Sequence, residues 1–246
     1  MFYGIIPIVL LSSIVSLSLL PFFKWFRETP HQMAAIKQLE DSLLDQDLLN
    51  EEAEWFQTWK TTGRSEQVYG VPYYNQLDSP TGYGGRECFD YAASMTAGFF
   101  NVIKSPHEYR QVRRRFGDTT TVYAHVNALQ ELGLDAQFKK DLRPEDIEIE
   151  LDAGRPIMLA YLSKGDFSKG EPPICDSEGC GHWLVVVGYN NSNELVVNDP
   201  MGFPLMETGG HDITQTGKMV RISRQAFNQR WLIEGDASGW GILIDR

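Results

Sequence analysis

A cysteine near the middle of the chain has the surroundings of a nucleophile. Cys88 follows Gly82, Gly84 and Gly85 and precedes a run with helical spacing. We therefore expect its sulfur at or near a helix N-terminus. The partial positive charge at such an end lowers the pKa of a thiol and favours the thiolate, which is the form that attacks a carbonyl. Cys88 is the candidate nucleophile.

A nucleophilic cysteine needs a base, and His182 is the candidate. It precedes the apolar run 183–189, which predicts an imidazole at the mouth of a buried strand. Asp199 closes a second apolar run, 195–197. If the two runs are adjacent antiparallel strands, the end of the second lies beside the start of the first. The carboxylate could then fix the tautomer and orientation of the imidazole. Taken singly, His182 could be a core histidine and Asp199 a turn residue.

The remaining residues of these types suggest one rival site. Cys175, Cys180, His182 and Asp199 together are ligand types that suit zinc. Their spacing is unlike that of structural zinc sites, and this interpretation leaves Cys88 unexplained. We therefore expect no metal and no cofactor. Of the other histidines, His107 and His125 lie in helical surroundings, and His211 lies in a glycine-rich loop.

Composition limits the class of protein. The chain has 246 residues, of which 42% are apolar, so it can bury a core as one large domain or two small ones. With 22 basic and 33 acidic residues, its net charge of -11 disfavours nucleic acid as a partner. The one basic run, Arg113 to Arg115, is interpreted as the solvated face of a helix. Three cysteines are too few for a disulfide-built fold, although Cys175 and Cys180 could pair with each other.

The first 65 residues are expected to form two accessory segments. Residues 1–23 contain an uncharged apolar stretch, 2–23, that is long enough to span a membrane, with an uncleaved anchor favoured over a signal peptide or a buried arm. Lys24 and Arg27 place the bulk of the chain weakly on the cytoplasmic side, so the side remains open. Residues 24–65 are predicted to form an acidic amphipathic helical stalk. Its part 31–60 could self-associate.

Residues 66–246 are predicted to form one domain with helices first and strands later, an α+β fold. Helices are expected over 89–103, 121–132 and 144–151, and short apolar runs bounded by Gly, Pro and Asn predict strands over 156–162, 183–189 and 194–197. The candidate nucleophile then lies on a helix, and the candidate base and acid lie at strand ends.

Several segments in this order resemble the bacteriocin-processing double-glycine peptidases, family thirty-nine of the cysteine peptidases in the papain-like clan. The resemblance covers about residues 67–232. It rests on Val-Pro-Tyr-Tyr-Asn-Gln at 71–76, on Cys88, on helix 121–132 and the stretch 151–158, on Gly-His-Trp-Leu-Val-Val-Val-Gly-Tyr at 181–189, and on Asn-Asp-Pro-Met-Gly at 198–202.

The resemblance implies a papain-like fold, with the nucleophile on an N-terminal helix packed against a mainly antiparallel sheet. It also implies that Cys88, His182 and Asp199 form a catalytic triad. Gln76 is similar to the glutamine whose side-chain amide, with the backbone N–H of the nucleophile, stabilises the oxyanion. The implied activity is hydrolysis of a peptide or amide bond through an acyl thioester.

The substrate and the activity itself leave alternatives. A glycine-rich peptide is implied by the resemblance, and a cell-wall peptide is the second candidate. The chain contains no phosphate loop and no six-helix membrane block, so trimming of an exporter's own cargo is not implied. The loop 175–180 before His182 and the sequence beside Cys88 also differ from the family pattern. The competing interpretation is a catalytically inactive papain-like module with a binding or structural role.

Overall fold

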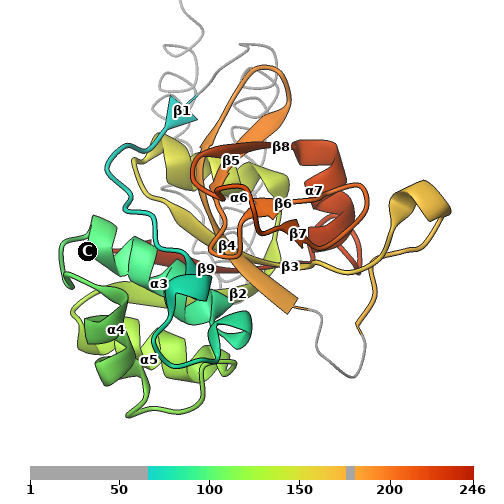
Figure 1. Ribbon diagram of the computed structural model, residues 1–246. Helices are drawn as coiled ribbons and strands as arrows, with labels where there is room; N and C mark the ends of the chain where they lie inside the picture. Colours follow the sequence, from blue (N-terminus) through green and yellow to red (C-terminus); the bar gives the residue numbers. More distant parts are fainter. Residues whose placement is uncertain (1–65, 176–180) are drawn as a thin grey trace, which may run out of the picture. The chain divides into compact units, whose positions relative to one another are not determined.

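The computed structural model of the chain describes residues 66–175 and 181–246 (Figure 1). The predicted membrane anchor, 1–23, and the predicted acidic stalk, 24–65, lie outside these ranges and stay predictions, as does the boundary at 65/66. Among the helices of the described residues, none combines the length and apolar character that a membrane crossing needs.

An antiparallel sheet of seven strands is the centre of the described part, in the order β2-β9-β3-β4-β5-β8 with β1 also paired to β4. Its strands are β1 (Glu66–Gln67), β2 (Asp135–Leu142), β3 (Ile157–Leu162), β4 (Gly181–Tyr189), β5 (Glu194–Asn198), β8 (Val220–Ser223) and β9 (Gly239–Asp245). A small two-stranded sheet pairs β6 (Phe203–Pro204) with β7 (His211–Asp212). The three strands expected from the apolar runs correspond to β3, β4 and β5.

Five α-helices are found in the described residues, and three of them lie together on one side of the sheet (Figure 1). This group consists of α3 (Cys88–Phe99), α4 (Pro106–Arg113) and α5 (Val122–Glu131). The other two are α6 (Pro144–Asp152) and α7 (Arg224–Trp231), and short 3₁₀ turns span Gln76–Asp78, Gly84–Arg86 and Phe167–Lys169. The expected helices 121–132 and 144–151 match α5 and α6 closely, whereas α3 ends four residues before its expected end at 103. The α+β architecture is therefore as predicted.

The helix α3 is tied to α4 by a buried ion pair. Arg113 Nε and Nη2 donate to the two carboxylate oxygens of Asp90 at 2.8 and 2.7 Å. Both side chains are buried, so the interpretation of Arg113 as part of a solvated face is wrong. A carboxylate inside the helix interface needs a paired cation, and the planar guanidinium meets both oxygens at once. Arg115, in the same basic run, does lie exposed.

A stack of three rings connects α5, α3 and β4. His125 stacks on Phe89 with ring centroids 3.6 Å apart, and Phe89 stacks on Trp183 with centroids 3.9 Å apart. Phe89 directly follows Cys88, and Trp183 directly follows His182. The stack therefore fixes the spacing between the first turn of α3 and the start of β4, which carry the candidate nucleophile and base.

His125 makes this stack sensitive to acid. Burial lowers the pKa of His125 from 6.5 to about 4, although the nearby Asp90 raises it. Between pH 6.5 and 4, His125 therefore takes up a proton in the unfolded chain but not in the folded chain. The free energy of unfolding falls over that pH range. At 1.36 kcal/mol per pKa unit, the loss is about 3 kcal/mol.

We predict that the free energy of unfolding of the wild type falls more steeply with acid than that of His125→Gln, by about 3 kcal/mol between pH 6.5 and 4. Urea denaturation at several pH values measures this difference. His107→Gln, at an exposed histidine of α4, is the matched control and should follow the wild type. Parallel curves for wild type and His125→Gln would contradict the assignment.

Candidate active site

One cleft collects three of the four predicted site residues, and the fourth lies directly behind it. The cleft has a volume of about 580 Å³, and Gln76, Cys88 and His182 are among the residues that line it. Residues of its walls come from α3, the loop between α4 and α5, the start of β4 and the segments around β6 and β7; they include Phe89, Thr119, Trp183, Met201, Gly210, His211 and Ile213. Asp199 is fully buried against His182. Residues distant in sequence thus meet around one opening.

Cys88 is the first residue of α3, as the glycine-rich approach predicts. Its side chain is half-buried and is a free thiol. Because the first N–H groups of a helix have no intrahelical acceptor, the backbone N–H of Cys88 is available to a ligand in the cleft. A thiol at this place can attack a group bound there, and the helix end can stabilise negative charge beside it.

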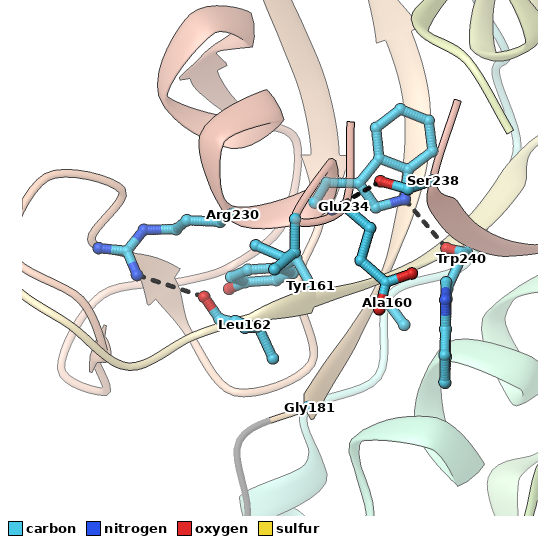
Figure 2. A pocket seen from close by; sticks show the side chains of 10 residues that line it. Ala160, Tyr161, Leu162, Gly181, Arg230, Glu234, Ser238 and Trp240 are labelled. Atoms are coloured by element: carbon cyan, nitrogen blue, oxygen red, sulfur yellow. Dashed lines mark hydrogen bonds between the residues drawn. The ribbon is translucent and has the colours of Figure 1, made fainter. Parts of the chain in front are cut away.

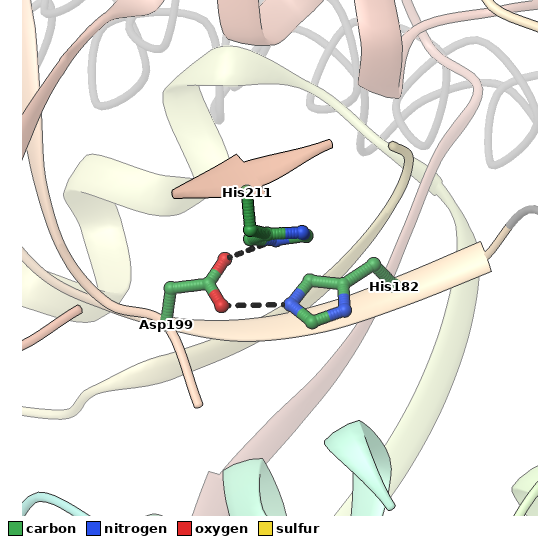
Figure 3. A group of neighbouring side chains, drawn as sticks. All are labelled: His182, Asp199 and His211. Atoms are coloured by element: carbon green, nitrogen blue, oxygen red, sulfur yellow. Dashed lines mark hydrogen bonds and ion pairs between the residues drawn. The ribbon is translucent and has the colours of Figure 1, made fainter. Parts of the chain in front are cut away.

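His182 and Asp199 form a buried pair. Nε2 of His182 donates to Asp199 Oδ1 at 2.8 Å, across the neighbouring strands β4 and β5 (Figure 3). The opposite ring nitrogen, Nδ1, remains for the cleft side. Burial alone would lower the pKa of His182, but Asp199 and Cys88 raise it to about 10. The ring is therefore held as a cation between a carboxylate and a thiol.

The carboxylate of Asp199 is held by four donors. Oδ1 accepts from His182 Nε2 and from the backbone N–H of Met201, each at 2.8 Å. Oδ2 accepts from the hydroxyl of Tyr161 and from His211 Nε2, each at 3.3 Å. Burial opposes the charge, but these partners, led by His182, lower the pKa of Asp199 well below its ordinary value. Asp199 stays ionised without contact to water.

His211 is the site residue that sequence reasoning missed. It begins β7, lines the cleft, and its ring centroid lies 4.4 Å from that of His182. Burial and the charge of His182 lower its pKa, so it is neutral beside the charged ring. Gly209 and Gly210 before it made the sequence look like an ordinary loop, and both glycines do have positive φ in the structure. No periodicity relates a loop histidine to a carboxylate twelve residues earlier.

Gln76 is buried and lines the same cleft as Cys88. Its backbone N–H donates to Pro200 O at 2.8 Å, which ties its segment to the turn after Asp199. One hydrogen of its side-chain amide goes to Gly84 O at 2.6 Å, and the second is free to serve a ligand. Among the described residues, its Oε1 finds no hydrogen-bond partner.

Tyr73 fixes the backbone around the carboxylate. Its hydroxyl donates to Asp199 O and accepts from the N–H of Gly217, both at 3.1 Å. Gly217 also accepts from the N–H of Asp199 at 2.8 Å, and an added Cβ at Gly217 would meet Asp199 O at 2.0 Å. This position therefore requires glycine.

Cys175 is disulfide-bonded, which settles one alternative. A disulfide sulfur is not a thiolate, so the zinc site built on Cys175, Cys180, His182 and Asp199 is wrong as drawn from the sequence. Cys180 itself lies outside the described residues.

A smaller, mostly apolar pocket adjoins the cleft. It has a volume of about 290 Å³ and shares Gly181 with the cleft (Figure 2). Tyr161, Trp231, Ile233 and Trp240 supply most of its apolar wall, and Arg230 and Glu234 lie at its sides. The two hollows therefore lie on either side of the start of β4.

The sequence model described as the Peptidase_C39-like family matches residues 68–238, which is more than half of the chain. No curated protein matches significantly.

Solved structures give matches at low identity. A Bacillus anthracis protein described as a C39-like peptidase is 14% identical, with a TM-score of 0.51 over 74% of this chain and 98% of that one. The peptidase domain of Streptococcus ComA, a bifunctional transporter of a quorum-sensing pathway, is 19% identical, with a TM-score of 0.45 over 71% and 98%. The double-glycine-motif protease of an AMS/PCAT transporter, solved with a leader peptide, is 16% identical, with a TM-score of 0.41 over 75% and 94%. At 14% identity, the first of these supports the fold.

Substitutions at two adjacent glycines can test how tightly the backbone of Gln76 packs against Gly84. A Cβ at Gly84 would lie 2.4 Å from the backbone oxygen of Gln76, whereas a Cβ at Gly85 meets nothing within 4 Å. Overpacking against backbone costs about 1–3 kcal/mol. We predict that Gly84→Ala loses this much stability in urea denaturation and that Gly85→Ala, the matched control, stays within about 0.5 kcal/mol of wild type. Equal losses would show that Gln76 is not held by this contact.

Proposed function

This chain belongs to the Peptidase_C39-like family, and on that premise we propose that it is a cysteine peptidase that cleaves peptide bonds through an acyl thioester on Cys88. The observation that carries the proposal is the buried His182–Asp199 pair, which opens onto the same cleft as a free thiol at a helix N-terminus. A structural histidine would have no need of an ionised carboxylate behind it and a thiol in front of it.

In the proposed mechanism, the His182 imidazolium and the Cys88 thiolate form an ion pair before the substrate binds. The sulfur attacks the carbonyl carbon of the scissile bond, forming the C–S bond. His182 then gives its proton to the departing amine as the C–N bond breaks. Water, deprotonated by His182, hydrolyses the thioester and restores the thiol. Asp199 holds the ring in one tautomer throughout.

The negative charge that develops on the carbonyl oxygen needs donors. The backbone N–H of Cys88 and the second amide hydrogen of Gln76 are the proposed pair. Each such donor typically contributes about 3 kcal/mol to stabilising the transition state. Gly84 O, which accepts the other amide hydrogen at 2.6 Å, would keep the Gln76 side chain aimed at the cleft.

The proposed substrate is a peptide bound in extended form. The volume of the cleft is large enough to hold several residues of a peptide. The apolar pocket, which shares Gly181 with the cleft, suits a hydrophobic side chain away from the scissile bond. A glycine-rich peptide is the first candidate because double-glycine cleavage is the activity of the resembling peptidases. A cell-wall peptide is the second.

The central test compares wild type and Cys88→Ala on Gly-Gly peptides and on peptidoglycan. We predict that wild type cleaves the peptides and that Cys88→Ala loses activity by at least about 10³-fold, because Cys88 is the free thiol of the described residues and the proposed nucleophile. Mass spectrometry of the products identifies the peptide bond that is cleaved. Mass spectrometry of the trapped thioester identifies Cys88 as the residue that carries the acyl group. If only peptidoglycan is cleaved, the substrate is a cell-wall peptide and not a glycine-rich one. Equal activity in both proteins would refute the assignment of Cys88 as the nucleophile.

Alkylation distinguishes the enzyme from an inactive papain-like module. We predict that iodoacetamide labels Cys88 at neutral pH much faster than free cysteine, because His182 stabilises the thiolate. His182→Gln should slow labelling at least about tenfold, and His107→Gln, at an exposed histidine, should not. Slow labelling of the wild type would favour a scaffold role.

A further inference from the structure

Asp199 and the two histidines around it form a ligand set for a metal ion. His182, His211 and Asp199 each offer one ligand atom, a ring nitrogen or a carboxylate oxygen, and these atoms all lie within 4.8 Å of one another (Figure 3). Two imidazoles and one carboxylate are a donor set that suits zinc and its neighbours in the first transition series. The zinc site considered from the sequence used cysteines, whereas this one uses none.

From this juxtaposition we infer that the cluster is an inhibitory site for a divalent transition-metal ion such as Zn²⁺, bound by His182, Asp199 and His211. At zinc bond lengths of 2.0–2.2 Å, tetrahedral ligand atoms lie about 3.4 Å apart. The present separations of Asp199 oxygens from the two Nε2 atoms are 2.8 and 3.3 Å. To admit an ion, the two rings, which line the cleft, would have to rotate away from Asp199.

Tyr161 would support the ion's ligand set. Tyr161 places its hydroxyl 3.1 Å from His211 Nε2 and 3.3 Å from Asp199 Oδ2, so it can hydrogen-bond a ligand carboxylate or a bound water. Both imidazoles reach the cleft wall, which gives the ion a way in from solvent. The buried carboxylate supplies one negative charge, and the ion would replace the hydrogens that now bridge it to the rings.

Metal binding and catalysis exclude each other at His182. An ion on Nε2 takes that lone pair, and Nδ1 then carries the ring's hydrogen. The ring can then no longer cycle between imidazolium and imidazole, so it cannot pass a proton to the departing amine and the proposed catalytic cycle stops. The ion would therefore inhibit the peptidase without touching the sulfur. This consequence rests on the proposed function, but the binding itself does not.

Binding is measured on the full chain with Zn²⁺ alone, by calorimetry of Cys88→Ala. We expect one equivalent of Zn²⁺ to bind to this variant. The loss of the thiol should not matter, because the thiol is not a ligand of the proposed site. In the same background, His211→Asn should weaken binding at least tenfold, and His107→Asn, the matched control at an exposed histidine, should not change it. Loss of binding in Cys88→Ala, or equal affinities for His211→Asn and His107→Asn, would overturn the site.

Cobalt gives a second measurement that leaves His211 in place. Co²⁺ added to the wild type should show the visible bands of a four-coordinate ion without a sulfur-to-metal charge-transfer band. A thiolate band that disappears in Cys88→Ala would place the ion on the nucleophile and overturn the proposal. In the peptidase assay, the Zn²⁺ concentration for half inhibition should rise at least tenfold in His211→Asn. If no peptidase activity exists, the binding experiments still decide the site.

Discussion

The buried carboxylate of Asp199 is the constraint on which the rest of the site depends. An ionised group removed from water is stable only when its lone pairs are filled, and here a backbone N–H, a phenol and two imidazoles fill them. Each donor comes from a different segment. The strands β3, β4 and β7 and the turn at Met201 must all be in place before the charge is satisfied. The same hydrogen bonds orient His182 toward the cleft. The contacts that make the buried charge stable are therefore also the contacts that set the geometry of the site.

The second constraint is the distance between α3 and β4, since the thiol lies on one and the imidazole on the other. No backbone hydrogen bond joins a helix to a sheet, so side chains must set that distance. The Phe89–Trp183 stack lies next in sequence to Cys88 and His182, and the Asp90–Arg113 pair ties α3 to α4. Both contacts are buried and directional. A purely aliphatic interface would bury comparable area but would tolerate sliding by an ångström, which is enough to separate a thiol from its base.

The sequence predicted those parts of the site that depend on local pattern. Cys88 was placed at a helix start by its glycines, and His182 and Asp199 were placed together because a short connection between two apolar runs predicts an antiparallel hairpin. Arg113 and His211 were misjudged or missed for one reason. Their roles depend on which elements pack together, and neither helical spacing nor a glycine-rich loop carries that information. A basic run looks the same whether its partner is water or a buried carboxylate such as Asp90.

The neutral state of His211 explains how one carboxylate can serve two imidazoles. Two cationic rings with centroids 4.4 Å apart would repel each other, and one carboxylate offsets only one charge. With His182 charged, His211 contributes a hydrogen bond instead of a charge, and burial helps to keep it in that form. The pair therefore behaves as an imidazolium and an imidazole sharing an anion, which is also the charge distribution that a divalent ion can replace. A second histidine at this position thus strengthens the hold on Asp199 and, by the same geometry, exposes the site to metal.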